Sequence, residues 1–396
     1  MKKILVIPSW YPSISNKGSG IFFLEQNRLM TNDFEIRVLA GVKKVNISRF
    51  RKLFNTISFL IIRSVKIREI KDFYVEPPRV YGFEFEYGIN ILRKKNYQRV
   101  IESYLKAFSG IYCEWKPDFI HAHDIYLGGI IAMYISRKFR IPFIISQHNY
   151  IWFNTYRFEY ADIKNALNEA EKILPVSQYI LKNILSQGVK CEYIVTGNYV
   201  DDSLYTLPEV TGEKSQFRIL FIGRNSIEKD IPTLIKTIRE FDNRCVTKNY
   251  CFIIIGSFSA GKHETFNELK DLEGRGNLIY HDYIDRLRMA EIMHNSDVLF
   301  STSISESFGL AACEAMMCGL PVVSANSGGF DDIYEPGVNG LKTNKGDYLA
   351  LADSLIRIKT GEVKFDPVSI RESVRSRYGT LAFKSRLSDI YNSINA

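Results

Sequence analysis

The stretch that decides the fold is residues 298–323, which read VLFSTSISESFGLAACEAMMCGLPVV. It opens with the apolar residues 298–300 and closes with the apolar residues 320–323, and an alanine-rich segment lies between them. Two short apolar runs around a helix-forming segment predict a strand, a loop, a helix and a second strand. This is one step of a parallel α/β sheet, in which ligands bind at the carboxyl ends of the strands.

Two carboxylates, Glu306 and Glu314, stand at the predicted loop and about one turn into the predicted helix. Gly309 has no Cβ, so a ligand can approach the backbone closely, and the amides of Gly309, Leu310 and Ala311 at a helix start favour an anion. A sugar nucleotide has hydroxyls on both sides of a diphosphate, which matches this order of groups. The alternative is that each glutamate is an ordinary surface charge.

The stretch resembles the signature of the family 4 retaining glycosyltransferases, in which seven residues separate two glutamates. The resemblance implies the GT-B fold, which has two Rossmann-like, doubly wound domains facing each other across a cleft. It also implies that Glu306 contacts the transferred sugar, that Glu314 binds the ribose, and that the turn Phe308, Gly309 and Leu310 holds the donor. The resemblance spans nearly the whole chain and is most specific over residues 218–353.

Apolar strands and helical segments alternate along the chain in two series, which predicts an α/β fold of two doubly wound halves. The predicted strands are residues 4–7, 36–39, 119–121, 143–146 and 173–176 in the first series, and 218–222, 251–255, 278–281, 298–301 and 322–324 in the second. Residues 126–138 and 381–394 read as helices. Turn-forming residues near 196–202 mark the junction.

These patterns and the resemblance together predict three parts of the chain. Residues 1–197 form an acceptor-side Rossmann-like domain, and residues 198–376 form the domain that binds the sugar nucleotide. Residues 377–396 contain a helix that crosses back to the first domain.

Two cations follow the strand at 218–222 in a polar loop that begins with a glycine turn. Arg224 can donate a fork of hydrogen bonds to phosphate oxygens, and Lys229 adds a compact positive charge. Such groups would stabilise a departing diphosphate, which gains negative charge in the transition state. The loop resembles the donor loop of the family, except that Asp230 stands where the family usually has glycine.

Three further segments carry predicted site residues. Tyr283 and Ile284 follow the strand at 278–281, and the resemblance places the nucleobase against their backbone. Gly20 ends a Gly-Ser-Gly turn that resembles the family's loop over the diphosphate and the acceptor. His148 follows the strand at 143–146 and matches a family histidine near the transferred sugar, although a structural core histidine is the alternative.

Two other features read as structural. His121 and His123 end a strand, and we interpret them as structural histidines that face opposite sides of it. Residues 326–329 match a glycine-rich turn of the family and read as a structural turn as well.

The composition limits the class of protein. The chain has 396 residues, 46% of them hydrophobic, and a net charge of +8. No nucleic-acid-binding motif accompanies this charge, so nucleic acid is not an expected partner. Six cysteines without paired spacing fit a reducing cytoplasm. Residues 47–63 mix basic and bulky apolar residues, and two interpretations stay open: an anionic membrane surface as partner, or packing in the core.

The sequence therefore predicts a retaining glycosyltransferase that moves a hexose-type sugar from a UDP- or GDP-sugar to a hydroxyl of a glycan or lipid-linked acceptor. Bacterial surface polysaccharide biosynthesis, in the cytoplasm or at the inner face of the membrane, is the expected setting. The chain contains no Asp-x-Asp triplet, so we expect no metal and no other cofactor. The alternatives are a sugar-nucleotide epimerase of similar fold and a catalytically silent, membrane-associated binding subunit.

Overall fold

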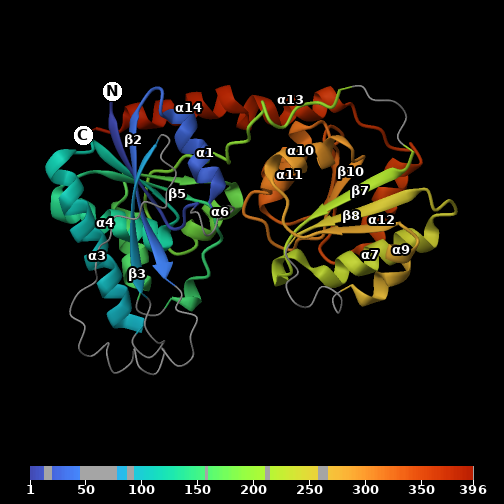
Figure 1. The fold of residues 1–396 in the computed structure, drawn as a ribbon, viewed down its shortest axis with the longest axis horizontal. Helices are drawn as coiled ribbons and strands as arrows, with labels where there is room; N and C mark the ends of the chain where they lie inside the picture. The colour runs from blue at the N-terminus through green and yellow to red at the C-terminus, as the bar shows by residue number, and fades with distance from the viewer. Residues whose placement is uncertain are drawn as a thin grey trace. The chain divides into compact units, whose positions relative to one another are not determined.

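The structure is a computed structural model that describes residues 1–12, 20–44, 78–86, 93–156, 159–209, 215–256 and 266–395. The chain divides into two compact units (Figure 1). The first comprises Met1–Val176, Ile180–Thr196 and Lys384–Ala396, and the second comprises Ser177–Tyr179 and Gly197–Phe383. The predicted amphipathic segment, residues 47–63, lies outside the described residues.

The first unit is built on a six-stranded parallel sheet in the order β3-β2-β1-β4-β5-β6. Its strands are β1 Lys3–Pro8, β2 Glu35–Lys44, β3 Arg79–Glu86, β4 Phe119–His123, β5 Phe143–Gln147 and β6 Lys172–Pro175. Its helices are α1 Ile21–Met30, α3 Arg93–Glu114, α4 Ile130–Phe139, α5 Tyr160–Glu169 and most of α6 Gln178–Leu185. Ile4, Leu5, Val6 and Ile7 are fully buried, as expected for a parallel strand with helices on both faces.

The second unit repeats this arrangement in the strand order β12-β11-β10-β7-β8-β9. Its strands are β7 Phe217–Ile222, β8 Tyr250–Ile255, β9 Leu278–His281, β10 Val298–Ser301, β11 Val322–Ala325 and β12 Gly340–Thr343. Its helices are α7 Ile231–Arg244, α9 Lys270–Gly274, α10 Arg286–His294, α11 Leu310–Met317, α12 Tyr348–Lys359 and α13 Pro367–Tyr378. Helices α10 and α11 cover one face of the sheet, and α7, α9 and α12 cover the other (Figure 1).

Both sheets have the strand order of the dinucleotide-binding Rossmann fold, so the α/β, doubly wound prediction is confirmed. Each predicted strand is present, but the outer strands β3 and β12 were not predicted. Strand β12 has only four residues, with a glycine and a lysine among them. Strand β3 contains Gly82 and three charged residues. Glycine and charged residues are depleted in strands, so edge strands of this composition carry little signal.

The predicted helix at 126–138 is wrong in its first turn. Helix α4 begins only at Ile130, after an irregular π-type turn over Ile125–Gly129. A Cβ on Gly128 would lie 2.6 Å from the carbonyl oxygen of His123 and 2.7 Å from that of Ile7. The chain therefore crosses directly over the ends of β1 and β4, and the helix starts after this crossing.

The last helix, α14 Thr380–Ser393, ends against the first sheet, and its residues from Lys384 onward belong to the first unit. The Tyr391 hydroxyl lies 2.7 Å from Nδ1 of His121. Lys2 Nζ donates to the carbonyls of Tyr391, Asn392 and Ile394, at 3.1, 3.0 and 2.7 Å. A cation at a helix C-terminus satisfies carbonyls that have no partner within the helix. No helix in the described ranges is long and apolar enough to cross a membrane.

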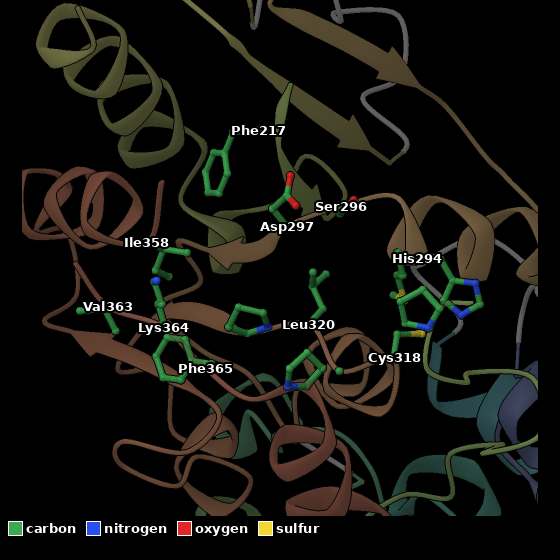
Figure 2. A pocket seen from close by; sticks show the side chains of 15 residues that line it. Phe217, His294, Ser296, Asp297, Cys318, Leu320, Ile358, Val363, Lys364 and Phe365 are labelled. Atoms are coloured by element: carbon green, nitrogen blue, oxygen red, sulfur yellow. The ribbon is translucent and has the colours of Figure 1, made fainter. Parts of the chain in front are cut away.

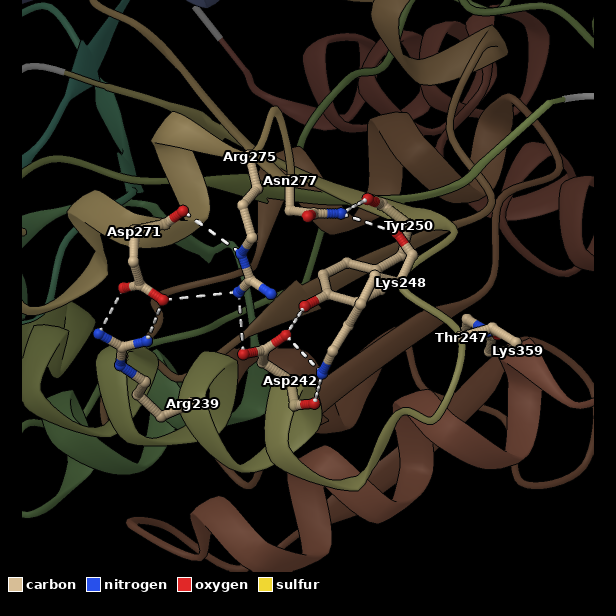
Figure 3. A network of polar contacts seen from close by, with 9 residues as sticks. All are labelled: Arg239, Asp242, Thr247, Lys248, Tyr250, Asp271, Arg275, Asn277 and Lys359. Atoms are coloured by element: carbon tan, nitrogen blue, oxygen red, sulfur yellow. Dashed lines mark hydrogen bonds and ion pairs between the residues drawn. The ribbon is translucent and has the colours of Figure 1, made fainter.

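A polar network lies in the second unit, around the end of α7 and the starts of β8 and β9 (Figure 3). Asp242, near the end of α7, has a side chain only 10% exposed and accepts from Lys248 Nζ at 2.9 Å and Arg275 Nη2 at 3.1 Å, and also from the Tyr250 hydroxyl. Asn277 Nδ2 donates to the carbonyls of Lys248 and Tyr250 at 2.9 and 2.6 Å. The network joins α7, the start of β8 and the turn before β9.

Asp242→Ala is expected to destabilise the protein by about 2–3 kcal/mol, because it leaves three donors around one buried position without their acceptor. Burial raises the pKa of Asp242. Hydrogen bonds from Tyr250, Lys248 and Arg275 lower it by a larger amount, so the pKa in the folded protein lies below the ordinary value. Because of this lowered pKa, the charged Asp242 carboxylate stabilises the folded protein fully at pH values above its ordinary pKa. This stabilisation is lost as the pH falls through the folded-state pKa.

Urea denaturation at pH 7 measures this difference. The control is Asp353→Ala, which removes an ion pair to Arg244 whose side chains are 39% and 46% exposed. Such a surface pair contributes less than about 1 kcal/mol. Equal losses in the two variants would contradict the role assigned to Asp242.

Candidate functional site

The predicted donor residues lie where the second sheet changes its winding direction. Strands β7 and β10 are neighbours, yet the chain continues from them toward opposite edges of the sheet. Ligands bind at this switch point, beyond the carboxyl ends of the strands. The loop after β7 carries Arg224 and Lys229, and the loop after β10 carries Glu306.

The structure pairs Glu306 with Lys229. The two side chains form an ion pair, and each is about one-fifth exposed. The Ser303 hydroxyl donates to the same Oε1 atom of Glu306 at 2.8 Å. The Thr302 hydroxyl donates to the carbonyl of Lys229 at 2.7 Å, which ties the two loops together. A carboxylate and a cation from separate loops are thus held side by side at the switch point.

The glycine turn at residues 326–329 packs against the loop that carries Glu306. The amide of Glu306 donates to the carbonyl of Ser327, and the amide of Gly329 donates to the carbonyl of Glu306, both at 2.8 Å. A Cβ on Gly329 would lie 2.4–2.5 Å from backbone atoms of Glu306, Ser307 and Phe308. The predicted turn at 326–329 is therefore the surface against which the Glu306 loop packs.

Helix α11 starts immediately after this loop. Gly309 precedes its first residue with φ 92° and ψ 48°, a left-handed conformation that favours glycine. The first amides of a helix, here from Leu310 onward, have no partner within the helix and attract an anion. The Phe308 side chain is buried, with its ring edge-on to Tyr378 at 5.0 Å. Any contact of Phe308 with a ligand must therefore be made by its backbone.

Glu314 lies in the second turn of α11, and 14% of its side chain is exposed. Arg286 Nη2 is 3.6 Å from its Oε1 atom, and Arg286 also lies over the ring of Tyr205 at 5.3 Å. Burial raises the pKa of Glu314 to about 7, although Arg286 and the Tyr205 hydroxyl act in the opposite direction. The carboxyl group is thus partly protonated at neutral pH.

Arg224, Tyr283 and Ile284 lie at the same carboxyl edge of the sheet. Arg224 is exposed, and within the described part of the chain it has no ion-pair partner. Tyr283 is 75% exposed in the loop between β9 and α10, and Ile284 is half-buried. Among the described residues, no hydrogen bond or ion pair joins these three residues to Glu306. They are grouped with it only because their loops lie at the same edge of the sheet.

Asp230, the departure from the family's loop, adopts the conformation that glycine would favour. Its φ is 46°, and its carboxylate caps α7 by accepting from the amide of Thr233 at 3.3 Å and from the Thr233 hydroxyl at 2.7 Å. Aspartate tolerates this backbone region better than most residues and is a good N-cap. The loop therefore retains a left-handed residue next to Lys229.

Gly20 and His148 belong to the first unit. Gly20 precedes α1 with φ 74°, and a Cβ there would lie 2.9 Å from the carbonyl oxygen of Trp10. His148 is buried: its amide donates to Asp124 Oδ1 at 3.0 Å, and its Nε2 atom lies 3.1 Å from Nδ1 of His123. Of the predicted Gly-Ser-Gly turn, Gly18 and Ser19 lie outside the described residues.

The prediction that His121 and His123 face opposite sides of β4 is wrong. Residues two apart on a strand share a face, and the two rings lie with their centroids 4.3 Å apart. Burial lowers the pKa of His121 to about 3 and that of His123 well below its ordinary value, so both rings are neutral. In the described residues, no cluster of three or more His, Cys, Asp or Glu side chains could hold a metal ion.

Sequence reasoning missed Ser303, Arg286 and Tyr205. Ser303 stands three residues before Glu306, and Arg286 stands two residues after Ile284, so position alone could have suggested them. Tyr205 gave no such signal, because it precedes the first strand of its unit and reaches Glu314 only through the fold.

A separate pocket of about 390 Å³ lies at the opposite, amino-terminal edge of the same sheet (Figure 2). Residues that line it include Phe217 at the start of β7, Asp297 just before β10 and Pro321 just before β11. None of the predicted site residues lines this pocket. The candidate site is therefore assigned from the side chains at the carboxyl edge.

Two family models match adjoining parts of the chain. Glycosyltransferase Family 4 matches residues 69–204, and Glycosyl transferases group 1 matches residues 206–375. Together they cover more than three quarters of the chain.

Curated relatives and solved structures agree with these matches. An uncharacterized glycosyltransferase of Methanocaldococcus jannaschii is 28% identical over 62% of this chain and 66% of its own length. The amylovoran biosynthesis glycosyltransferase AmsK of Erwinia amylovora is 24% identical over 58% of each chain. The matched part thus spans less than two thirds of either relative.

Among solved structures, Anabaena HepE in complex with UDP aligns over 100% of both chains, with a TM-score of 0.70 and 18% identity. This likeness concerns the fold alone. With the two family models and two parallel-sheet, Rossmann-like units, the chain belongs to the family 4 and group 1 glycosyltransferases of GT-B type.

Proposed function

We propose that the protein transfers a hexose-type sugar from a UDP- or GDP-sugar to a hydroxyl of a glycan or lipid-linked acceptor, with retention at the anomeric carbon. The observation that carries this proposal is the pairing of Glu306 and Lys229 at the switch point, directly before the start of α11. A carboxylate, a cation and helix-start amides together suit a ligand that carries both hydroxyls and phosphates.

Each residue of the site has a proposed role. Glu306 accepts hydrogen bonds from the sugar hydroxyls, and Lys229 and Arg224 stabilise the negative charge that develops on the departing diphosphate. The amides at the start of α11 hold phosphate oxygens, and Glu314 accepts from the ribose hydroxyls. Tyr283 and Ile284 lie against the base. In the first unit, His148 and Gly20 serve the sugar and acceptor side.

The relatives support the donor and the setting of this proposal. HepE was solved with UDP, and AmsK is named for amylovoran biosynthesis. We extend these to a nucleotide-sugar donor and to surface polysaccharide biosynthesis for this chain. A cytoplasmic location, with or without contact to the inner membrane face, belongs to the same proposal and is testable by cell fractionation.

A donor panel tests the transfer reaction. The protein is incubated with UDP- and GDP-linked hexoses, with and without a lipid-linked oligosaccharide, and the products are separated by chromatography. Release of nucleoside diphosphate together with an extended acceptor supports transfer, and NMR of the new linkage reports retention. An epimerised donor formed without acceptor would instead identify an epimerase. Unchanged rates after treatment with EDTA are expected if Arg224 and Lys229 act without a metal.

Glu314 makes the proposed donor site sensitive to pH. A carboxylate accepts hydroxyl hydrogen bonds more strongly when it is charged. With a pKa of about 7, Glu314 loses most of its charge between pH 8 and pH 6, so affinity for the UDP-sugar is expected to fall by up to about 10-fold. Because its pKa is raised in the folded protein, Glu314 favours the folded state more at pH 6 than at pH 8. The loss of affinity at pH 6 is therefore not caused by unfolding that the titration of Glu314 brings about.

Calorimetric titration of the UDP-sugar at pH 6, 7 and 8 measures the effect. The control is Glu314→Gln, whose affinity is expected to be low and independent of pH over this range. The other ionisable groups around Glu314 are the same in the variant and the wild type, so they do not account for a difference between the two. They include Arg286, Tyr205, Cys313 and Cys318. An equal pH dependence in the variant would assign the effect to another group.

A further inference from the structure

The first unit has its own switch point, between β1 and β4. The loops after β4 and β5 are joined there: the amide of Ile125 donates to Gln147 Oε1 at 2.8 Å, and Asn149 Nδ2 donates to Asp124 Oδ2 at 3.2 Å. Ser9, directly after β1, donates to the carbonyl of Tyr126 at 2.7 Å. Three strand ends therefore hold one compact loop cluster at the position where α/β sheets bind ligands.

This loop cluster carries four aromatic side chains. Tyr150 and Trp152 follow β5, with ring centroids 4.8 Å apart, and Tyr126 and Tyr156 pair at 4.8 Å across the two loops. Trp152 is 54% exposed, and the three tyrosines are half-buried. Large aromatic side chains with a polar end, gathered on loops at a ligand-binding edge, are typical of recognition surfaces.

The backbone beneath the aromatics is strained. Asp124 has φ 61° and ψ 142°, and Leu127 has φ 69° and ψ −63°, in regions that side-chain-bearing residues rarely adopt. The fold fixes this conformation through the Ser9 hydroxyl, which accepts from the amide of Gly128 at 3.1 Å. Strain that the surrounding structure enforces is concentrated at ligand-binding and catalytic sites.

Exposed asparagines flank Trp152 in the sequence. Asn149 and Asn154 are both exposed, one on each side of Trp152 in the sequence. A pyranose ring presents C–H groups on one face and hydroxyls around its rim. An exposed aromatic face with exposed asparagines near it in the sequence offers groups for both, whereas an acyl chain would use only the aromatic face.

We infer that the loop cluster formed by Tyr126, Tyr150, Trp152 and Tyr156 binds a sugar ring of the acceptor, with Trp152 as the stacking face. This inference rests on the proposed glycosyl transfer and deepens it, because it makes the acceptor a glycan recognised through its sugar. The lipid part of a lipid-linked acceptor does not contact this surface.

Saturation-transfer NMR with methyl glycosides of glucose, galactose, mannose and N-acetylglucosamine tests the inference on the full chain. At least one glycoside is expected to receive saturation through its C–H protons. Trp152→Ala is expected to reduce the transfer at least fivefold, and Trp152→Phe, which keeps an aromatic face, to restore at least half of it. Tyr193→Ala is the matched control, because Tyr193 is 47% exposed in the same unit and lies outside the loop cluster.

The outcomes separate the inference from the proposed function. No transfer to any glycoside, or equal transfer in wild type and Trp152→Ala, overturns the inference. So does a blue shift of tryptophan fluorescence on phosphatidylglycerol vesicles that Trp152→Ala abolishes, without any response to glycosides, which would identify a membrane surface instead. Binding of the UDP-sugar is expected to be unchanged in Trp152→Ala. If the wild type binds no nucleotide sugar, the proposed function fails, whatever the glycosides show.

Discussion

Replacing Glu306 by glutamine is expected to lower the turnover number at least about 100-fold, with little change in folding. Glutamine keeps the size of the side chain but removes the negative charge of the carboxylate. That carboxylate pairs with Lys229 and accepts a hydrogen bond from Ser303. A single preorganised electrostatic group in an active site contributes a factor of about 10²–10³ to the rate. The measurement is initial-rate kinetics with the donor that the panel identifies.

The ion pair is partly buried, since both side chains are about one-fifth exposed, but the amide oxygen of glutamine can still accept from Lys229 and Ser303, so the loss of stability is expected to be about 1 kcal/mol. The melting temperature of Glu306→Gln is therefore expected to stay within a few degrees of the wild type. Glu291→Gln is the control: it removes an exposed ion pair to Arg288 on α10 and is expected to keep full turnover. Unchanged turnover in Glu306→Gln would remove this residue from the site.

Gly329→Ala is expected to abolish most of the activity and to destabilise the second unit by about 2–4 kcal/mol. The added Cβ would meet three backbone atoms of the Glu306 loop at 2.4–2.5 Å, and backbone cannot move aside as a flexible side chain can. The loop must shift, and a shift of about 1 Å in a catalytic group is enough to cost about 100-fold in rate.

Gly274→Ala is the matched control for this substitution. Gly274 also lies in the second unit, at the end of α9, and nothing lies within 4 Å of the Cβ that the substitution adds. Its activity and its unfolding midpoint are expected to equal those of the wild type within error. A Gly329→Ala variant with normal kinetics would show that the glycine turn does not position Glu306.

The sequence predicted the strands well because each buried strand is encoded locally. Strand β8 and residues 4–7 of strand β1 are uninterrupted apolar runs, which a parallel sheet covered on both faces requires. The predictions failed where tertiary contacts override the local pattern. Residues 126–129 read as helix, but the crossing over β1 and β4 forces an irregular turn there.

The candidate site was predictable in part. Glu306, Arg224 and Lys229 could be located because a loop after a strand always opens at the carboxyl edge of a parallel sheet. Their partners could not be read in the same way: Tyr205 and Arg286 reach Glu314 from separate segments. Phe308 appears in the donor turn by sequence, yet its ring packs into the core against Tyr378.

The sequence by itself determined the order of all strands except β3 and β12, the position of each functional loop after its strand, and the family. These follow from hydrophobic periodicity and short-range spacing, which act within a few residues. Only the tertiary structure decided that Lys229 pairs with Glu306, 77 residues away, and that burial places the pKa of Glu314 near neutrality. The pairing depends on strands β7 and β10 lying side by side, and the pKa depends on α11 being buried with Arg286 and Tyr205 around Glu314. Both arrangements exist only once the whole unit is assembled.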